Sequence, residues 1–399
     1  MKKILIVDDE VQILKALQRM FLETDYEVHM AESSAEAMKL LETTDIDLVI
    51  SDMRMPFEDG YKLLSMVKDK YPKIIRIILS GYADEKPMFR ALLHNIAKLY
   101  VFKPWNNTDF LNNIKRLFAD ESVIHSEELL DKINKLGLSS EIPTNCEAMI
   151  GLIEEENTEK LIENIENDPE ISNLLIQVAK SAVYGVMPNT VRQASLYIGL
   201  HNLKAFMRWA CIVCAATKNA PKADKPEILV SHSYLTNRIY LFLFEAFLHK
   251  QPPESAMFSG LMHNIGLILL VNCLQTSGKL SAPLDSADDY MQVDYGEYME
   301  FHQEVGAHFL DQWDLPFTLY EAALYHHNPL HTNVINQEMV ACVHIAQAYA
   351  WKTLGVSEPK VIAPEVFKCI DTTVEEFEMK LSRYLKGNKM FTSYVFMNC

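Results

Sequence analysis

The stretch Leu48-Val49-Ile50-Ser51-Asp52-Met53-Arg54-Met55-Pro56 decides the fold of the N-terminal part of this chain. In it, an apolar run of strand length ends in a single carboxylate, Asp52. Three further runs of the same kind also end in polar side chains, at Asp8-Asp9, Ser80 and Lys103. Because the carboxyl ends of parallel strands lie at one edge of an open α/β sheet, we expect these side chains to lie close together.

The first 120 residues alternate between two kinds of pattern. Short apolar runs predict strands near residues 3–7, 26–30, 46–51, 74–79 and 99–102. Segments with an apolar stripe at helical spacing predict helices near residues 10–23, 34–43, 60–70, 84–95 and 107–119. Five such βα units predict a doubly wound, five-stranded parallel sheet of the flavodoxin-like α/β class.

The polar residues at the predicted sheet edge suit phosphoryl transfer. Three carboxylates held close together repel one another unless a cation joins them, and their oxygens suit Mg²⁺. The sequence therefore predicts Asp8, Asp9 and Asp52 as a magnesium site and one of these aspartates as the acceptor of a phosphoryl group.

Residues 1–120 resemble the receiver domain of two-component response regulators. The resemblance rests on the order and spacing of the polar residues at the strand ends, together with Met55-Pro56, Gly81 and Pro104. The resemblance implies that a sensor histidine kinase phosphorylates Asp52. It implies that Asp9 and Asp52 hold Mg²⁺ directly, with Asp8 acting through water. It also implies that Lys103 pairs with the phosphoryl oxygens, that Ser80 donates a hydrogen bond to them, and that Tyr100 is the switch aromatic.

The pattern changes to helices alone from about residue 141. We expect a receiver domain at 1–120, a helical linker at 121–140, an all-α output domain at 141–350 and a partly helical C-terminal extension at 351–399. Long helices are predicted near 191–216, 227–249, 256–272, 300–313, 316–327 and 335–354. The pair Cys211 and Cys214 lies in an apolar helical run and is expected to be part of the core.

Seven polar residues of this helical region follow the order of the metal ligands in HD-type phosphohydrolases. They are His232, His263, Asn264, His302, His326, His327 and Gln347. The layout is incomplete, because Asn264 and Gln347 are amides where that family has aspartates. Leu267 stands where a lysine is expected, and no Gly-Tyr-Pro motif follows His327. Neutral amide oxygens weaken the binding of divalent metals, and they make a bridged metal pair unfavourable.

Residues 141 to about 350 instead resemble the HDOD domain, a non-catalytic relative of the HD superfamily. The resemblance rests on short segments in order, among them Asp168–Ile171, Lys180–Gly185, Val191–Leu200, His263–Gly266 and Trp313–Pro316. It implies an output domain that binds an unknown downstream protein and holds at most a single transition metal. The alternative is a receiver-gated, metal-dependent phosphohydrolase acting on a cyclic dinucleotide or another nucleotide.

The net charge differs between residues 1–120 and residues 121–399, and this difference limits the kinds of partner that the second region can bind. The formal net charge is −17, while residues 1–120 carry 17 Lys and Arg against 19 Asp and Glu. Residues 121–399 therefore carry −15, which opposes binding to DNA, RNA or an anionic membrane. The apolar stretches Tyr240–Leu248 and Leu267–Leu274 are too short to span a bilayer, so we expect no membrane insertion and a cytoplasmic protein. The sequence leaves formation of a homodimer open.

Overall fold

The computed structural model describes residues 1–56, 59–81, 92, 94–139, 144–155, 157–181, 188–280 and 282–387. The chain divides into two compact units, Met1–Asp120 and Glu121–Cys399.

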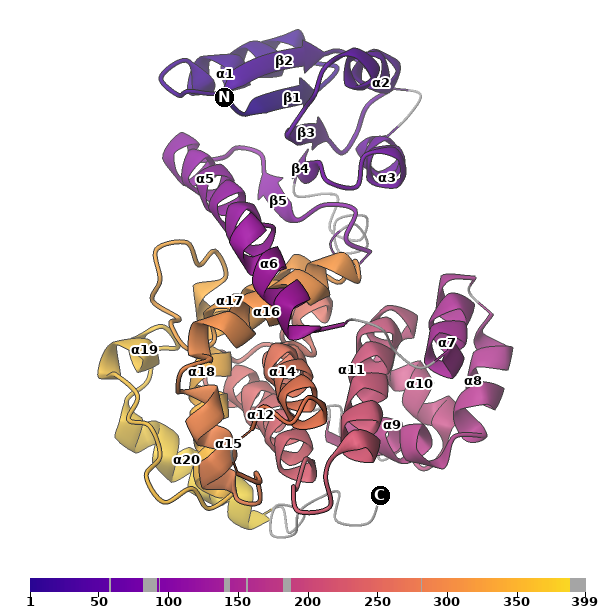
Figure 1. Cartoon of the computed structure of the whole chain (residues 1–399). Coiled ribbons are helices and arrows are strands. Elements are labelled where there is room, and N and C mark those ends of the chain that lie inside the picture. The colour runs from indigo at the N-terminus through magenta and orange to yellow at the C-terminus, as the bar shows by residue number, and fades with distance from the viewer. Residues whose placement is uncertain are drawn as a thin grey trace. The chain divides into compact units, whose positions relative to one another are not determined.

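The first unit is built on a parallel sheet in the order β2-β1-β3-β4-β5. The strands are β1 (Lys3–Val7), β2 (Glu27–Ala31), β3 (Leu48–Asp52), β4 (Ile75–Ser80) and β5 (Leu99–Phe102). The helices are α1 (Val11–Phe21), α2 (Ser34–Thr43), α3 (Gly60–Lys70) and α5 (Asn107–Ile124), which continues past the boundary of the unit (Figure 1). The predicted doubly wound α/β class is confirmed, whereas the helix predicted at 84–95 lies almost wholly outside the described residues.

Burial on both faces explains why β3 and β4 are mostly apolar and lack the regular alternation of a half-exposed strand. Every residue of β3 and β4 is buried, because helices cover both faces of a doubly wound sheet. Two of the helices that follow strands, α2 and α3, begin at capping residues: the side chain of Ser33 accepts from the backbone amide of Glu36, and that of Asp59 accepts from the backbone amide of Lys62. The strand ends and the turns after them are thereby held in place at one edge of the sheet.

The second unit is helical in all its described elements (Figure 1). Its helices are α6 (Glu127–Leu136), α7 (Thr144–Glu154), α8 (Thr158–Glu166), α9 (Pro169–Ser181), α10 (Val191–Ile198), α11 (Leu200–Asn219), α12 (Glu227–Ala246), the short 3₁₀ helix η2 (Glu254–Ala256), α13 (Ser259–Met262), α14 (Ile265–Thr276), α15 (Ala287–Asp294), α16 (Met299–Gln312), α17 (Phe317–Tyr325), α18 (Gln337–Thr353), α19 (Pro364–Lys368) and α20 (Val374–Gly387).

Two of the predicted long helices are divided in the structure. The segment 191–216 breaks at Gly199, whose φ of 78° a residue with a side chain rarely adopts. The segment 256–272 breaks at His263-Asn264, just before Gly266. A Cβ atom on Gly266 would lie 2.0 Å from the backbone oxygen of His302, so this glycine permits the close crossing of α14 and α16. Helical periodicity does not show either break, since the apolar spacing continues across it.

Helix α12 forms the centre of the second unit. All residues from Ile228 to Phe244 are buried, and the helix packs along α18. The stretch Glu254–Thr276 has the mean hydropathy (1.6) and length of a membrane span, yet 89% of its most apolar window is buried inside the protein. Its apolar composition is therefore explained by its place in the core of this unit.

The segment predicted as a helical linker, residues 121–140, is part of the second unit and packs against its other helices. Leu129 and Ile133 of α6 are buried. The Nδ1 atom of His308 lies 2.7 Å from the backbone oxygen of Ile124. The thiol of Cys273 donates a hydrogen bond to the backbone oxygen of Leu136. A disulfide between Cys146 of α7 and Cys211 of α11 joins two further helices. Cys211 is buried in the core as expected, but its pairing with Cys146, 65 positions away, was not predicted.

Candidate functional sites

Asp8, Asp52 and Lys103 meet at the carboxyl edge of the parallel sheet. The Lys103 ammonium lies 2.8 Å from Oδ2 of Asp8 and 2.5 Å from Oδ1 of Asp52. The carboxylates themselves are almost fully buried, with exposed side-chain fractions of 1% and 8%. Three strands that are far apart in sequence thus deliver two anions and one cation to one point.

The other oxygen of each carboxylate is held by the backbone. Oδ1 of Asp8 accepts from the amide of Glu10 at 2.8 Å, and Oδ2 of Asp52 accepts from the amide of Arg54 at 2.9 Å. The turn after Asp52 also requires Gly60, because a Cβ atom there would lie 1.9 Å from the backbone oxygen of Asp52. The position of the Asp52 carboxylate therefore depends on local backbone geometry as well as on Lys103.

Burial and the ion pairs act in opposite directions on these groups. Burial raises the pKa of Asp52, and the hydrogen bond and charge of Lys103 oppose that rise. Burial lowers the pKa of Lys103, but its hydrogen bonds with Asp52 and Asp8 outweigh burial, so the pKa is raised overall. Lys103 is thus a permanent cation beside the two carboxylates.

Three other predicted residues of this edge differ in exposure. Asp9 is exposed, next to the buried Asp8. Ser80 is buried at the end of β4, and its hydroxyl donates to the backbone oxygen of Gly81 at 3.3 Å. Tyr100 is partly buried against the core of the unit, with its ring 5.1 Å from that of Phe102. A solvent-open hollow beside Lys103 is lined by Ile13, Pro104, Trp105 and Asn107.

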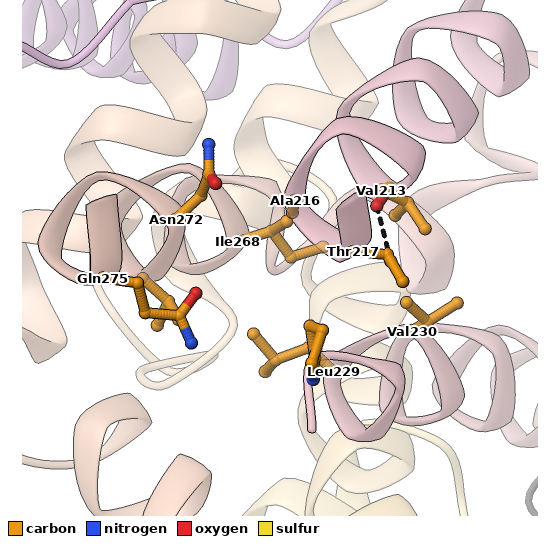
Figure 2. A pocket seen from close by; sticks show the side chains of 10 residues that line it. Val213, Ala216, Thr217, Leu229, Val230, Ile268, Asn272 and Gln275 are labelled. Atoms are coloured by element: carbon orange, nitrogen blue, oxygen red, sulfur yellow. Dashed lines mark hydrogen bonds between the residues drawn. The ribbon is translucent and has the colours of Figure 1, made fainter. Parts of the chain in front are cut away.

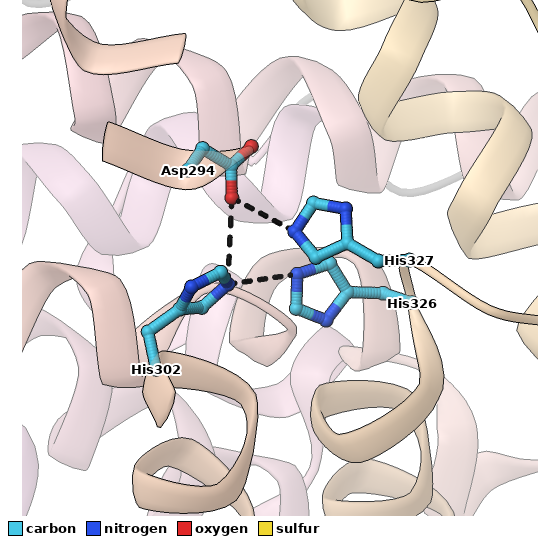
Figure 3. A group of neighbouring side chains, drawn as sticks. All are labelled: Asp294, His302, His326 and His327. Carbon is cyan, nitrogen blue, oxygen red and sulfur yellow. Dashed lines mark hydrogen bonds and ion pairs between the residues drawn. The ribbon is translucent and has the colours of Figure 1, made fainter. Parts of the chain in front are cut away.

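The second unit contains a compact cluster of Asp294, His302, His326 and His327, whose ligand atoms all lie within 4.8 Å of one another (Figure 3). Oδ1 of Asp294 lies 3.1 Å from Nε2 of His327 and 3.4 Å from Nε2 of His302. The Nε2 atoms of His302 and His326 are 3.2 Å apart. The side chains of Asp294 and His302 are fully buried, and that of His327 is 3% exposed.

Asp294 was not among the residues predicted for this site. It is the last residue of α15, and its other oxygen accepts from the indole of Trp351 at 2.8 Å. Burial raises the pKa of Asp294, but the nearby rings of His327, His302 and His232 outweigh burial and lower it overall. Asp294 thus adds a carboxylate beside the histidines, which the seven residues predicted from the sequence do not include. No motif surrounds Asp294, so sequence spacing offered no signal for it.

Of the remaining predicted residues, His263 and Gln347 contact the histidines of the cluster, and His232 contacts both of them. The His263 ring is 5.0 Å from that of His326, and the His232 ring is 5.4 Å from that of His263. His232 stacks on Trp351 at 3.8 Å, with its Nε2 atom 3.1 Å from the backbone oxygen of Gln347. The amide of Gln347 faces the Nδ1 atom of His327 at 3.3 Å. Asn264 is fully buried, and neither polar atom of its amide has a hydrogen-bond partner within the described chain.

A small pocket of the second unit lies apart from this cluster (Figure 2). It is bounded by helices α11, α12 and α14, and its lining is mainly aliphatic, with Val213, Leu229, Val230 and Ile268 among the residues. Thr217 donates its hydroxyl to the backbone of its own helix at Val213. This pocket has no charged or metal-binding side chain, and we assign no chemistry to it.

Family models assign both regions of the chain. Residues 4–115 match the response regulator receiver domain, and residues 140–329 match the HDOD domain. The hydrogenase transcriptional regulatory protein HoxA of Bradyrhizobium diazoefficiens is 35% identical over 112 residues, which make up 28% of this chain and 23% of that protein. The response regulator SaeR of Staphylococcus epidermidis is 31% identical over 138 residues, 35% of this chain and 59% of that protein.

A solved signal receiver domain of an HD domain-containing protein from Pseudomonas fluorescens Pf-5 is 32% identical. The match covers 30% of this chain and 96% of that one, with a TM-score of 0.29. The chain spans less than a quarter of the length of the HoxA relatives, and the similarity to the curated relatives named here is of receiver-domain length.

Proposed function

We propose that this chain, a response regulator in which a receiver domain is followed by an HDOD domain, uses phosphorylation of Asp52 to control binding of a downstream protein by its HDOD domain. The observation that carries the proposal is the buried arrangement of Asp8, Asp52 and Lys103 at the sheet edge. In the reaction, a carboxylate oxygen of Asp52 forms a bond to phosphorus while the bond between phosphorus and the histidine nitrogen of a sensor histidine kinase breaks. The phosphoryl group thereby passes from the kinase to Asp52.

The donor atoms at this edge fit Mg²⁺, because hard carboxylate oxygens converge there and the exposed Asp9 stands beside them. Asp9 and Asp52 would hold the ion directly and Asp8 through water. When bound, Mg²⁺ would spread the charge of the phosphoryl oxygens. Lys103 is placed to pair with those oxygens, and Ser80 is placed to donate a hydrogen bond to them once it leaves the backbone of Gly81. Tyr100, packed against the core beside β4, would serve as the switch aromatic.

The HDOD domain acts in this proposal as a protein-binding module without hydrolase activity. Asn264 and Gln347 lack the charge that HD-type metal pairs use. Asp294, His302 and His326 are buried and the side chain of His327 is 3% exposed, which leaves little surface for a nucleotide to contact. A single transition metal is the most that we assign to this domain. Its charge of −15, counted over residues 121–399, disfavours nucleic acid as the partner. We place the protein in the cytoplasm, where sensor kinases have ATP.

Phosphorylation of the full-length chain by a small phosphodonor with Mg²⁺, followed by intact mass, tests the receiver assignment. We expect the wild type to gain one phosphoryl group, and Asp52→Asn to gain none. The matched control is Asp45→Asn, an exposed aspartate of the same unit, which should be labelled like the wild type. Labelling of the Asp52→Asn variant at the wild-type rate would refute the assignment.

Affinity capture from a lysate with wild-type and Asp52→Asn chains, each with and without phosphodonor, tests the output. A protein retained in proportion to phosphorylation of Asp52 supports the proposal. Turnover of a cyclic dinucleotide that depends on phosphorylation would instead favour the phosphohydrolase.

A further inference from the structure

The two histidines nearest to Asp294 have their tautomers set by the backbone. The Nδ1 atom of His302 lies 3.0 Å from the carbonyl oxygen of Tyr298, and that of His326 lies 2.8 Å from the carbonyl oxygen of Ala323. A carbonyl oxygen only accepts, so each Nδ1 atom donates a proton and each neutral ring carries its lone pair on Nε2.

Those two lone pairs point at each other and at a carboxylate. The Nε2 atoms of His302 and His326 are 3.2 Å apart, and Oδ1 of Asp294 is 3.4 Å from the first of them. Three acceptors brought together in a buried place repel one another unless a cation lies between them.

The spacing of the atoms fits a metal ion. Two ligands bound to one tetrahedral Zn²⁺ at its usual bond lengths lie about 3.4 Å apart. Three of the separations among these ligand atoms are 3.1 Å (Asp294 to His327), 3.2 Å (His302 to His326) and 3.4 Å (Asp294 to His302). We propose that Asp294, His302, His326 and His327 bind one divalent transition-metal ion of the zinc class in a closed, structural site.

The residues around the cluster support this assignment. The Trp351 indole holds the second oxygen of Asp294, so that this carboxylate presents only Oδ1 to the ion, and the backbone carbonyls orient two of the rings. Such partners fix ligand orientation in metal sites. Four protein ligands complete a tetrahedron, which leaves no position for a substrate or a reactive water. The site therefore deepens the proposed function, on which it rests, by giving the non-catalytic output domain a metal that orders it.

The metal would join three segments that are separate in sequence. Asp294 ends α15, His302 lies in the first half of α16, and His326 and His327 follow directly after α17 (Figure 3). This ligand set differs from the HD layout, because the anion comes from Asp294, outside that pattern, and the pair His263-Asn264 does not take part. Asp294 thus supplies the anionic ligand that the amides Asn264 and Gln347 cannot supply.

Metal binding to the full-length protein tests the site. Protein stripped with a chelator is titrated with Zn²⁺, the bound metal is counted by elemental analysis, and Co²⁺ is used to read the coordination geometry from its visible absorption. With excess Mg²⁺ present to occupy the receiver site, we expect one equivalent of Zn²⁺, an intense tetrahedral Co²⁺ spectrum and a higher melting temperature with Zn²⁺. Asp294→Asn and His302→Gln should weaken binding by more than about tenfold, the scale on which even supporting residues act.

The matched control is His263→Gln, a buried histidine of the HD pattern outside the four ligands. It should retain one equivalent and the Co²⁺ spectrum, and circular dichroism checks that each variant is folded. A folded wild type that binds no Zn²⁺ or Co²⁺ would overturn the site in favour of a trapped proton. Two equivalents, or equal loss in His263→Gln, would overturn it in favour of the HD ligand set. Labelling of Asp52 in the same samples shows separately whether the receiver proposal stands.

Discussion

The Nε2 atom of His125 lies 3.0 Å from Oδ2 of Asp311, a residue 186 positions further along the chain. The same nitrogen is 3.3 Å from Oε2 of Glu121. His125 directly follows α5, and Asp311 lies in the last turn of α16, the helix that also carries His302. Together with the contact between His308 and Ile124, this ion pair fastens α6 and the end of α5 to α16.

The ion pair makes the stability of the second unit depend on pH. Hydrogen bonds to Asp311 and Glu121 raise the pKa of His125 from 6.5 to about 9, although burial opposes them. Because the folded-state pKa is the higher one, the stabilisation is complete below about pH 6.5 and is lost as the pH rises through about 9. Thermal melting between pH 6 and 10 should show this loss in the wild type and a weaker one in His125→Gln.

The variant Asp311→Asn tests whether the ion pair of His125 with Asp311 causes that pH dependence of stability. If the pair is responsible, His125→Gln should have a smaller effect in the Asp311→Asn background than in the wild type. His249→Gln, which alters an exposed histidine of the same unit, should leave the profile unchanged. Equal effects of His125→Gln in both backgrounds would contradict the assignment.

Gly60→Ala should destabilise the receiver domain and impair phosphorylation together. The added Cβ atom would meet the backbone of Asp52, which must shift, and overpacking of this kind costs about 1–3 kcal/mol. Denaturant unfolding and the rate of labelling by a small phosphodonor measure the two effects. Gly81→Ala is the control, since its Cβ atom would meet nothing within 4 Å, and a Gly60→Ala chain as stable as this control would contradict the prediction.

Lys103→Gln should make the receiver domain more dependent on Mg²⁺. Without the ammonium, Asp8 and Asp52 face each other with no cation between them, at a cost of about 1–3 kcal/mol. Mg²⁺ can replace that charge, so it should raise the melting temperature of Lys103→Gln by more than that of the wild type. Lys115→Gln, an exposed change in α5, should respond like the wild type. Equal Mg²⁺ shifts in all three proteins would show that Lys103 does not act as the counterion.

Restoring the HD-type aspartates should not restore an enzyme. In the metal-free protein, Asn264→Asp places an unpaired carboxylate at a fully buried position, which should cost about 1–3 kcal/mol or shift its pKa upward. Asn264→Asp with Gln347→Asp should raise metal uptake without turnover of a cyclic dinucleotide, because Leu267 and the missing Gly-Tyr-Pro motif remain. Asn189→Asp is the exposed control for stability. Measurable turnover by the double variant would show that these two substitutions alone silenced a hydrolase.

The sequence by itself determined the receiver fold and the gathering of Asp8, Asp52 and Lys103. A parallel strand buried on both faces is a continuous apolar run, so its end is visible in the sequence, and the sheet brings such ends to one edge. The histidines of the second unit were also found from their order, because His263, His302, His326 and His327 follow a familiar spacing.

Only the tertiary structure decided which of these histidines contact one another and that the carboxylate of Asp294 lies beside them. Asp294 joins His302 and His327 because α15, α16 and the segment after α17 pack together, and nothing local to Asp294 marks that contact. The break at Gly199, the close crossing at Gly266 and the pair of His125 with Asp311 have the same origin. Helical periodicity shows which face of a helix is buried, whereas the partner of that face is set by long-range packing, which depends on the whole chain.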